Sequence, residues 1–272
     1  MTKKIILVSA LFGLFYFNSW GAETAKPRLT FIGHATVLIE GQEINLLTDP
    51  FWGNQILGKV KRLIPPAVKV SELPRIDLIL ISHTHPDHYD LQAIEEIGIK
   101  DKPIVIMPWG RGMQLKNLGY TVIELRAGQI YRQGKTTITA VTAKHMYGHC
   151  LGYLIEIDGK KIYFTGDTKF FSGLAQLKKE KIDLMMLPYD GYQIMGSVWT
   201  IGQALEAVKE VHPRLVIPIH WGTFNRWYTK KQAEPPEVFC NMIEKSAPEI
   251  RSLVLQPGEN MDLDSLEHET SR

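Results

Sequence analysis

The residues of this chain that are best suited to chemistry lie in one short histidine-rich segment. It covers residues 82–90 and reads SHTHPDHYD. Imidazole and carboxylate groups are suitable ligands for zinc, manganese and iron. Because alternate side chains in such a segment point in different directions, His83 and His85 can hold one cation while Asp87 and His88 reach a second. The segment therefore indicates a metal site.

Apolar strands must position these ligands. The run at residues 76–81, IDLILI, predicts a buried strand that ends where the histidines begin. Three later apolar runs also lead, within a few residues, to a metal-type ligand, namely His145, Asp167 and His220. Strand ends on one edge of a sheet converge, so we expect these side chains to complete the site.

Strand-rich stretches alternate with single helices in both halves of the chain. Helices are expected over residues 91–97, 111–117, 171–179, 201–211 and 235–243, with a last strand at 252–255 and a frayed polar tail from Asp262. This alternation predicts an α/β protein with two mixed β-sheets packed face to face and helices outside, a four-layer αββα sandwich.

The motifs, taken in order, resemble those of the metallo-β-lactamase superfamily of metal-dependent hydrolases. They are His-x-His-x-Asp-His, a later histidine, Gly-Asp-Thr at 166–168 and a final histidine after a strand. The resemblance runs from about Leu29 to about Glu259. GHAT at 33–36, TDPF at 48–51 and PIHWGTF at 218–224 are similar to two enzyme groups. These are the N-acylphosphatidylethanolamine-hydrolysing phospholipases D and the ascorbate-6-phosphate-lactonase-like hydrolases.

The resemblance implies a binuclear site with seven ligands. The first metal would be held by His83, His85 and His145, and the second by Asp87, His88 and His220. Asp167 would bridge the two. Two divalent ions are expected, zinc first, with manganese or iron as alternatives. A hydroxide between them would be the nucleophile. Asp87 and His88 are the catalytic candidates, and Asp87 could pass a proton to the leaving group.

Two residues are candidates for supporting the ligands rather than binding metal. Asp49 follows a strand and could accept a hydrogen bond from a ligating imidazole, and His34 could do similar work. The alternatives are an aspartate that stabilises the turn before Pro50 and a histidine packed in the core.

Four further residues are candidates for contact with substrate. Tyr147 and His149 come just after His145, Trp221 comes just after His220, and Asp190 ends another strand. An acid at Asp190 departs from the phospholipase-like pattern, which has a small residue there. A basic cluster at Lys59, Lys61 and Arg62 could meet an anionic group, or simply be solvated.

The N-terminus predicts export. Residues 1–21 combine two lysines with a short apolar run and small residues at a cleavage position, as in a signal peptide. We expect a single hydrolase domain over 22–272, secreted or periplasmic and without a stable membrane span, and an uncleaved anchor is the alternative. The N-terminal residue of the exported protein distinguishes the two.

Composition narrows the class of partner. The chain has 272 residues, a formal charge of +2 and 44% hydrophobic residues, which does not indicate a nucleic-acid binder. Its two cysteines, Cys150 and Cys240, could form a disulfide or remain two thiols. Oligomeric state is left open.

The function that these observations favour is a secreted binuclear metal-dependent hydrolase. Its substrate would be a small or lipid-derived molecule, with a phosphodiester or a lactone preferred. The alternatives are a β-lactamase or other amide hydrolase on the same metals, a redox enzyme with two irons, and a non-catalytic metal-binding module.

Overall fold

The computed structural model describes residues 26–56, 58, 60–145, 149–189, 199–224 and 234–266. The predicted signal peptide at 1–21 lies outside these residues, and its presence stays a prediction. None of the helices in the described part of the chain is both long and apolar enough to cross a bilayer.

Two seven-stranded sheets form the centre of the molecule. In spatial order the first sheet contains β16 (Asn260–Asp262), β1 (Arg28–Gly33), β2 (Thr36–Glu40), β3 (Asn45–Thr48), β6 (Leu78–Leu80), β7 (Ile104–Pro108) and β8 (Val122–Leu125). The second contains β15 (Arg251–Ser252), β14 (Leu215–Ile219), β13 (Leu184–Pro188), β12 (Lys160–Phe164), β11 (Leu151–Ile157), β10 (Thr136–Thr142) and β9 (Ile130–Gln133). Both sheets combine parallel and antiparallel pairs.

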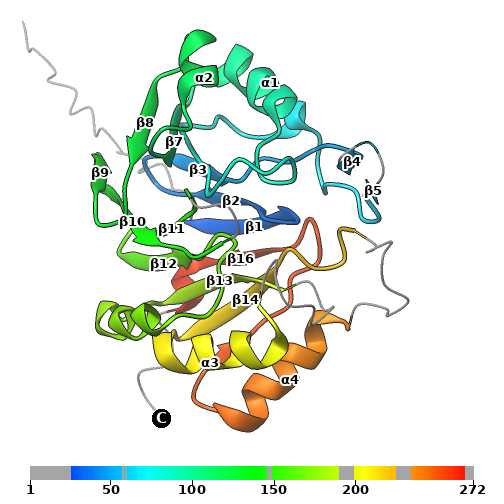
Figure 1. The fold of residues 1–272 in the computed structure, drawn as a ribbon, viewed down its shortest axis with the longest axis vertical. Coiled ribbons are helices and arrows are strands. Elements are labelled where there is room, and N and C mark those ends of the chain that lie inside the picture. The colour runs from blue at the N-terminus through cyan, green and yellow to red at the C-terminus, as the bar shows by residue number, and fades with distance from the viewer. Residues whose placement is uncertain are drawn as a thin grey trace, which may run out of the picture.

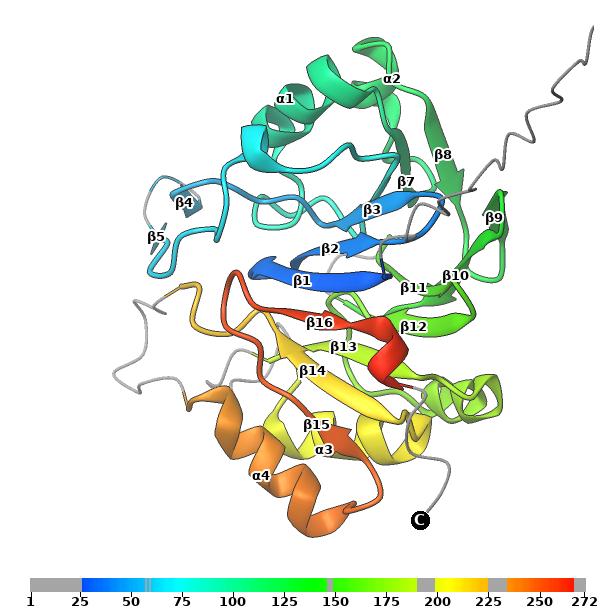
Figure 2. The ribbon, with the colours of Figure 1, turned by 180° about the vertical axis from the view of Figure 1, so that it is seen from behind.

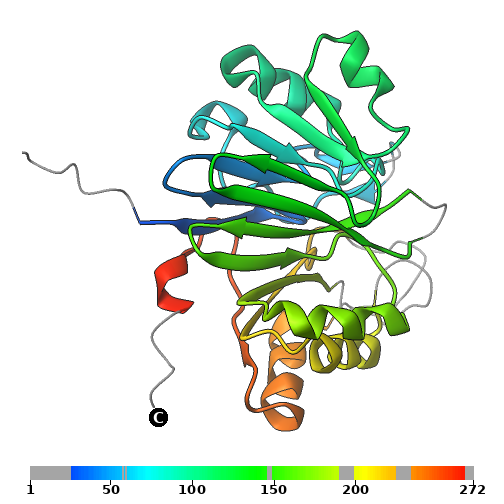
Figure 3. The same ribbon diagram turned by 90° about the vertical axis from the view of Figure 1, so that its left-hand side faces the viewer.

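Helices cover the outer faces of the two sheets. On the first sheet lie α1 (Leu91–Asp101) and α2 (Met113–Asn117) (Figure 1). On the second lie α3 (Ile201–Val211), α4 (Pro236–Ser246) and a 3₁₀ helix at Ser172–Glu180. The side view in Figure 3 shows both sheets stacked between these helices. The predicted four-layer αββα sandwich is confirmed.

The continuous apolar run at 78–81 is explained by burial on both sides of its strand. Leu78 and Leu80 belong to the core between the sheets, whereas Ile79 belongs to the core beneath α1. Alternate side chains of a strand point to opposite faces, so a strand covered on both faces must be apolar throughout. Helix α1 begins directly after the histidine-rich segment. Asp90, the last residue of that segment, caps the helix by accepting a hydrogen bond from the Ala93 amide. The histidine-rich segment is therefore anchored at both ends.

The prediction of a frayed tail from Asp262 is wrong as far as Leu266. Strand β16 pairs antiparallel with β1, and the two strands lie side by side in Figure 2. A 3₁₀ helix at Leu263–Leu266 follows. Its two leucines are buried, since a spacing of three residues brings both to one face of such a helix. The flanking aspartates make this segment look polar in sequence.

Smaller differences concern short elements. The expected helix at 171–179 is a 3₁₀ helix, and the strand expected at 252–255 is β15 at Arg251–Ser252, which is followed within the described residues by one further strand, β16. The irregular region after Phe51 contains a small hairpin of β4 (Gln55–Ile56) and β5 (Val60–Lys61), and a 3₁₀ turn at Val70–Glu72. Elements of two or three residues are too short to show a hydrophobic period.

Candidate metal centre

The predicted ligands meet at the end of the strands that carry them. The histidine-rich segment follows β6, while His145, Asp167 and His220 follow β10, β12 and β14. The first strand belongs to one sheet and the other three to its partner, so the cluster joins both halves of the sandwich.

Three imidazoles form the first group. The His85 Nδ1 atom lies 2.9 Å from His83 Nε2 and 3.3 Å from His145 Nε2. Burial, the largest influence on both rings, lowers the pKa of His83 and of His145, so both are neutral near pH 7 and carry a free lone pair. Three ring nitrogens that converge in this way match the donor set of a bound cation.

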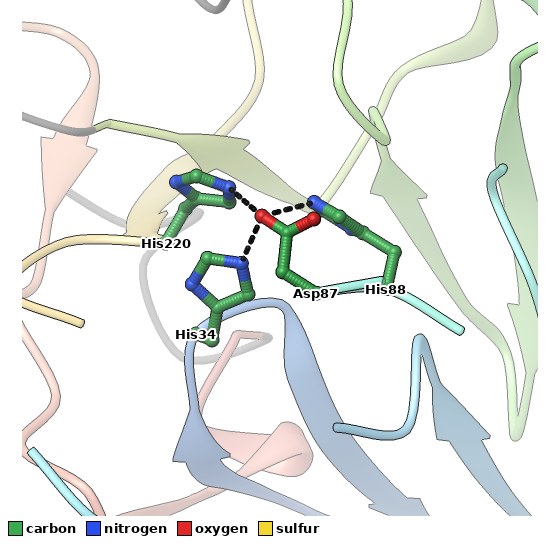
Figure 4. Close-up of side chains that lie close together, drawn as sticks. All are labelled: His34, Asp87, His88 and His220. Atoms are coloured by element: carbon green, nitrogen blue, oxygen red, sulfur yellow. Dashed lines mark hydrogen bonds and ion pairs between the residues drawn. The ribbon is translucent and has the colours of Figure 1, made fainter. Parts of the chain in front are cut away.

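A carboxylate and two imidazoles form the second group. The Asp87 Oδ2 atom lies 3.8 Å from His88 Nε2 and 3.9 Å from His220 Nε2 (Figure 4). Two ligands bound at about 2.1 Å to one tetrahedral cation lie roughly 3.4 Å apart, so this spacing needs only small adjustments to hold an ion. The His34 ring also reaches this group.

Asp167 lies between the two groups. Its Oδ2 atom is 3.5 Å from His88 Nε2, 3.9 Å from His220 Nε2 and 3.9 Å from His145 Nε2. A carboxylate in this position can reach ions held by either group. Its role as a bridge stays a prediction, but the geometry needed for it is present.

Unpartnered polar atoms provide a test of whether these residues fit a cation. Within the described residues, His88 Nε2, His220 Nε2 and Asp167 Oδ1 are buried without a hydrogen-bond partner, and all three belong to the candidate ligands. Buried polar atoms are rarely left unpaired, because each unmade bond costs about 1–3 kcal/mol. A bound divalent ion would supply the missing partner, so the residues present fit a metal.

The second group has an unusual charge balance. Burial by itself opposes charge on His88, but the neighbouring Asp167 and Asp87 outweigh it and raise the His88 pKa well above its usual 6.5. Burial likewise opposes charge on Asp87 and Asp167, yet the surrounding histidines hold the pKa of both carboxyls below the usual 3.8. Without metal, His88 is therefore an imidazolium among carboxylates.

Metal uptake is therefore expected to release a proton from His88. Because the His88 pKa lies above 6.5, the metal must displace a proton at neutral pH, and the affinity should rise as pH rises toward that pKa. Calorimetric titration of the metal-free protein with Zn²⁺ at pH 7, in two buffers of different protonation enthalpy, should report about one proton released for the ion in this group. Identical heats in both buffers would contradict this reading.

Asp49 supports one ligand in each group. Its Oδ2 atom accepts hydrogen bonds from His88 Nδ1 at 2.7 Å and from the Ser82 hydroxyl at 2.5 Å, and its Oδ1 atom accepts the Ser82 amide at 2.6 Å. The Ser82 Oγ atom in turn lies 2.9 Å from His83 Nδ1. These bonds keep a proton on Nδ1 of His83 and of His88, so that with a metal bound the remaining ring nitrogen, Nε2, would face the ion. The hydrogen bond expected between Asp49 and an imidazole is present, while the role of Asp49 in supporting a metal ligand stays a prediction. Ser82 is the link that sequence reasoning missed.

Of the four candidates for contact with substrate, the structure describes only Trp221 and His149. Trp221 is buried and packs against Phe31, with ring centres 6.0 Å apart, and His149 is exposed. Tyr147 and Asp190 lie outside the described residues. Contact of all four with a substrate stays a prediction.

Arg62 differs from its expected place in a solvated basic cluster. Its guanidinium points inward, donating to the carbonyls of Ile64 and Phe51 and lying 4.9 Å from the centre of the Phe51 ring. Burial lowers its pKa to about 10. Arg62 therefore fastens the β4–β5 hairpin beside the metal centre.

Neither cysteine forms a disulfide. Cys150 is buried beside the centre, where its thiol donates to the Asp167 carbonyl at 3.1 Å, and burial raises its pKa well above the usual value. Such a thiol is a poor nucleophile.

Comparison with known proteins agrees with this geometry. Residues 44–221 match the family described as the beta-lactamase superfamily domain. The chain is similar to N-acyl-phosphatidylethanolamine-hydrolyzing phospholipase D 1 of Caenorhabditis elegans, at 32% identity over 79% of this chain and 69% of the relative. It is also similar to a UPF0173 metal-dependent hydrolase of Pyrococcus furiosus, at 29% identity over 87% of this chain and 99% of the relative.

A solved structure supports the fold. Igni18, a metallo hydrolase of Ignicoccus hospitalis, superposes with a TM-score of 0.67 at 23% identity, over 87% of this chain and 97% of that one. With the family match over well more than half of its length and the His/Asp cluster in place, the chain belongs to the metallo-β-lactamase superfamily and is a metal-dependent hydrolase.

Proposed function

We propose that this hydrolase is binuclear and acts on a phosphodiester or a lactone. The observation that carries the proposal is the position of Asp167, whose one carboxylate oxygen lies within 4 Å of histidines from both ligand groups. A single-ion site would need only one of these groups. The close approach of two complete groups favours two ions.

The protein's own residues have distinct parts in this mechanism. When bound, the two ions would lower the pKa of a shared water toward neutrality and stabilise negative charge on the attacked group. The two ligand groups would hold the ions, and Asp49 orients the rings of His83 and His88 through its hydrogen bonds to His88 and Ser82. Asp87 stays ionised because its pKa is held low. A carboxylate this acidic is a weak base, which favours its role as a ligand over one in proton transfer.

Two observations support the substrate class. The described thiols, Cys150 and Cys240, both have a pKa raised by burial, so neither is an activated nucleophile. A nucleophile derived from water suits direct hydrolysis of phosphate esters and of activated carbonyls. The C. elegans relative bears the name of a phospholipase D, an enzyme of phosphodiester hydrolysis.

Metal analysis is the experiment that tests the proposal. Protein purified without chelator is expected to contain about two equivalents of zinc, manganese or iron per chain by elemental analysis. Removal of the metal with dipicolinate should abolish hydrolysis of bis(p-nitrophenyl) phosphate or of a simple γ-lactone, and the same metal should restore it. A chromogenic cephalosporin in the same panel tests the β-lactamase alternative.

The outcomes separate the possible sites. One tightly held equivalent with full activity would replace the binuclear proposal with a mononuclear one. Turnover by protein shown to be metal-free would overturn metal catalysis itself. Two equivalents of metal without turnover of any probe would support the binuclear centre but contradict the proposed substrate class.

A further inference from the structure

His34 occupies a backbone conformation that a histidine rarely adopts. It is the first residue of the two-residue turn between β1 and β2, and its φ angle is +60°. Turns of this length favour glycine at a left-handed position, since other L-residues are strained there. The other described non-glycine residues with positive φ include three that end helices: Lys102, Lys181 and His212. His34 caps no helix, so the reason for a side chain here must lie in what that side chain contacts.

His34 contacts two ligands of the second group. Its Nε2 atom lies 3.3 Å from Asp87 Oδ2, and its ring centre lies 3.8 Å from that of His220 (Figure 4). Its carbonyl also accepts a hydrogen bond from the His220 amide at 2.6 Å. One residue therefore touches the Asp87 carboxylate and both the backbone and the ring of His220.

The His34 ring is itself held in place by aromatic neighbours. Phe51 and Phe224 pack against it roughly edge-on, with ring centres at 5.7 and 5.3 Å. The His34 side chain is almost completely buried. Its orientation is therefore set by packing and does not depend on a bound ion.

The ring distances indicate that His34 is not itself a ligand. Two imidazoles bound to one tetrahedral cation place their ring centres roughly 5 Å apart. Within the proposed ligand groups, the ring centres of His83 and His145 are 5.0 Å apart, those of His88 and His220 5.3 Å, and those of His83 and His85 4.4 Å. The ring centre of His34 lies 5.2 Å from that of His88, so the distance to His220 decides. The 3.8 Å between His34 and His220 is too short, and corresponds to one ring lying on the other.

The position of the proton on the neutral His34 ring also indicates that His34 is not a ligand. If Nε2 of His34 were bound to a cation, the proton of the neutral ring would sit on Nδ1. In the described part of the chain, Nδ1 is buried and has no partner. With the proton on Nε2 instead, the ring donates to Asp87, and only an acceptor is left unpaired. Buried acceptors without a partner are tolerated better than buried donors.

We propose that His34 is a positioning residue for the second metal. It donates from Nε2 to the Asp87 carboxylate and supports the ring of His220, and so sets the affinity of the second group while leaving the first group unaffected. The inference rests on the proposed binuclear function.

The test compares variants that keep the backbone unstrained. His34→Gly removes the ring and accepts a positive φ freely, and His34→Asn keeps an N–H donor and tolerates this conformation. His212→Gly is the matched control, because His212 also has positive φ (+55°) but lies at the exposed end of α3. Metal-free proteins are titrated with Co²⁺ against a chromophoric chelator, and thermal unfolding of the metal-free proteins checks the fold.

The wild type and His212→Gly are expected to bind two ions alike. In His34→Gly the second ion should bind about 10–100-fold more weakly while the first is unchanged, and His34→Asn should fall between. The Co²⁺ absorption spectrum of saturated His34→Gly should match the wild type, because no ligand has been removed.

Three results would overturn the inference. They are wild-type affinity for both ions in His34→Gly, equal weakening of both ions, and a changed spectrum at saturation, which would make His34 a ligand. A wild type that binds one ion overturns the binuclear proposal instead. In that case, weaker binding of the single ion in His34→Gly would still support His34 as the support of Asp87 and His220, and unchanged binding would reject it.

Discussion

Replacing Asp167 by asparagine is expected to abolish hydrolysis, with a loss of roughly three orders of magnitude or more. The buried Asp167 carboxylate lies next to histidines of both groups. Its negative charge would partly neutralise the positive charge of two bound cations. An amide keeps the size of the side chain but removes its negative charge, so it cannot neutralise two neighbouring ions. Metal content should fall from about two equivalents to one or fewer.

The measurements are elemental analysis and the rate of bis(p-nitrophenyl) phosphate hydrolysis in the same preparations. Asp158→Asn is the matched control. Asp158 has positive φ in the turn between β11 and β12 and accepts a hydrogen bond from the Gln42 amide, both of which asparagine can reproduce. Asp167→Asn protein that retains two ions and full activity would show that the carboxylate does not act as a bridge.

The convergence of the candidate ligands could be predicted from local signals, whereas their division into two groups came from the family resemblance. An apolar strand can be recognised from a few residues, and the residue after it must lie at a sheet edge. His83, His145 and His220 each follow such a run, so their convergence needs only the rule that strand ends of one edge meet. The overall sandwich followed from the same signals, since long periodic elements carry most of its core.

The partners of the ligands could not be predicted in the same way. Ser82 links Asp49 to His83 through a hydroxyl, and serine beside a strand has many ordinary uses. Arg62 appears in sequence as a surface cation, and only the fold of the β4–β5 hairpin turns it inward. His34 meets His220 across the interface of two sheets, a contact that no local pattern records. Such interactions depend on tertiary packing between distant parts of the chain.

Replacing Asp49 by asparagine is expected to lower the affinity of the protein for both metal ions, each by about 10–100-fold. The Ser82 amide is a fixed donor, so the amide oxygen of asparagine should stay with it and the new NH₂ group should face His88 and the Ser82 hydroxyl. His88 Nδ1 then loses its acceptor, and the ring proton moves to Nε2, the atom that faces the metal. The Ser82 hydroxyl, now accepting from the amide, would donate to His83 Nδ1 and shift that proton in the same way.

Two companion variants test the hydrogen-bond route from Asp49 through Ser82 to His83. Ser82→Ala removes the link to His83 but leaves the bond from His88 to Asp49, so it should weaken the first ion alone. Asp77→Asn makes the same carboxylate-to-amide change at the opposite end of β6, where Asp77 accepts the Asn45 amide, and it should leave both affinities unchanged. Competition with a chromophoric chelator measures each affinity. If Asp49→Asn weakened only the second ion, the route through Ser82 would be excluded, and His83 would be oriented by its packing rather than by the shared carboxylate.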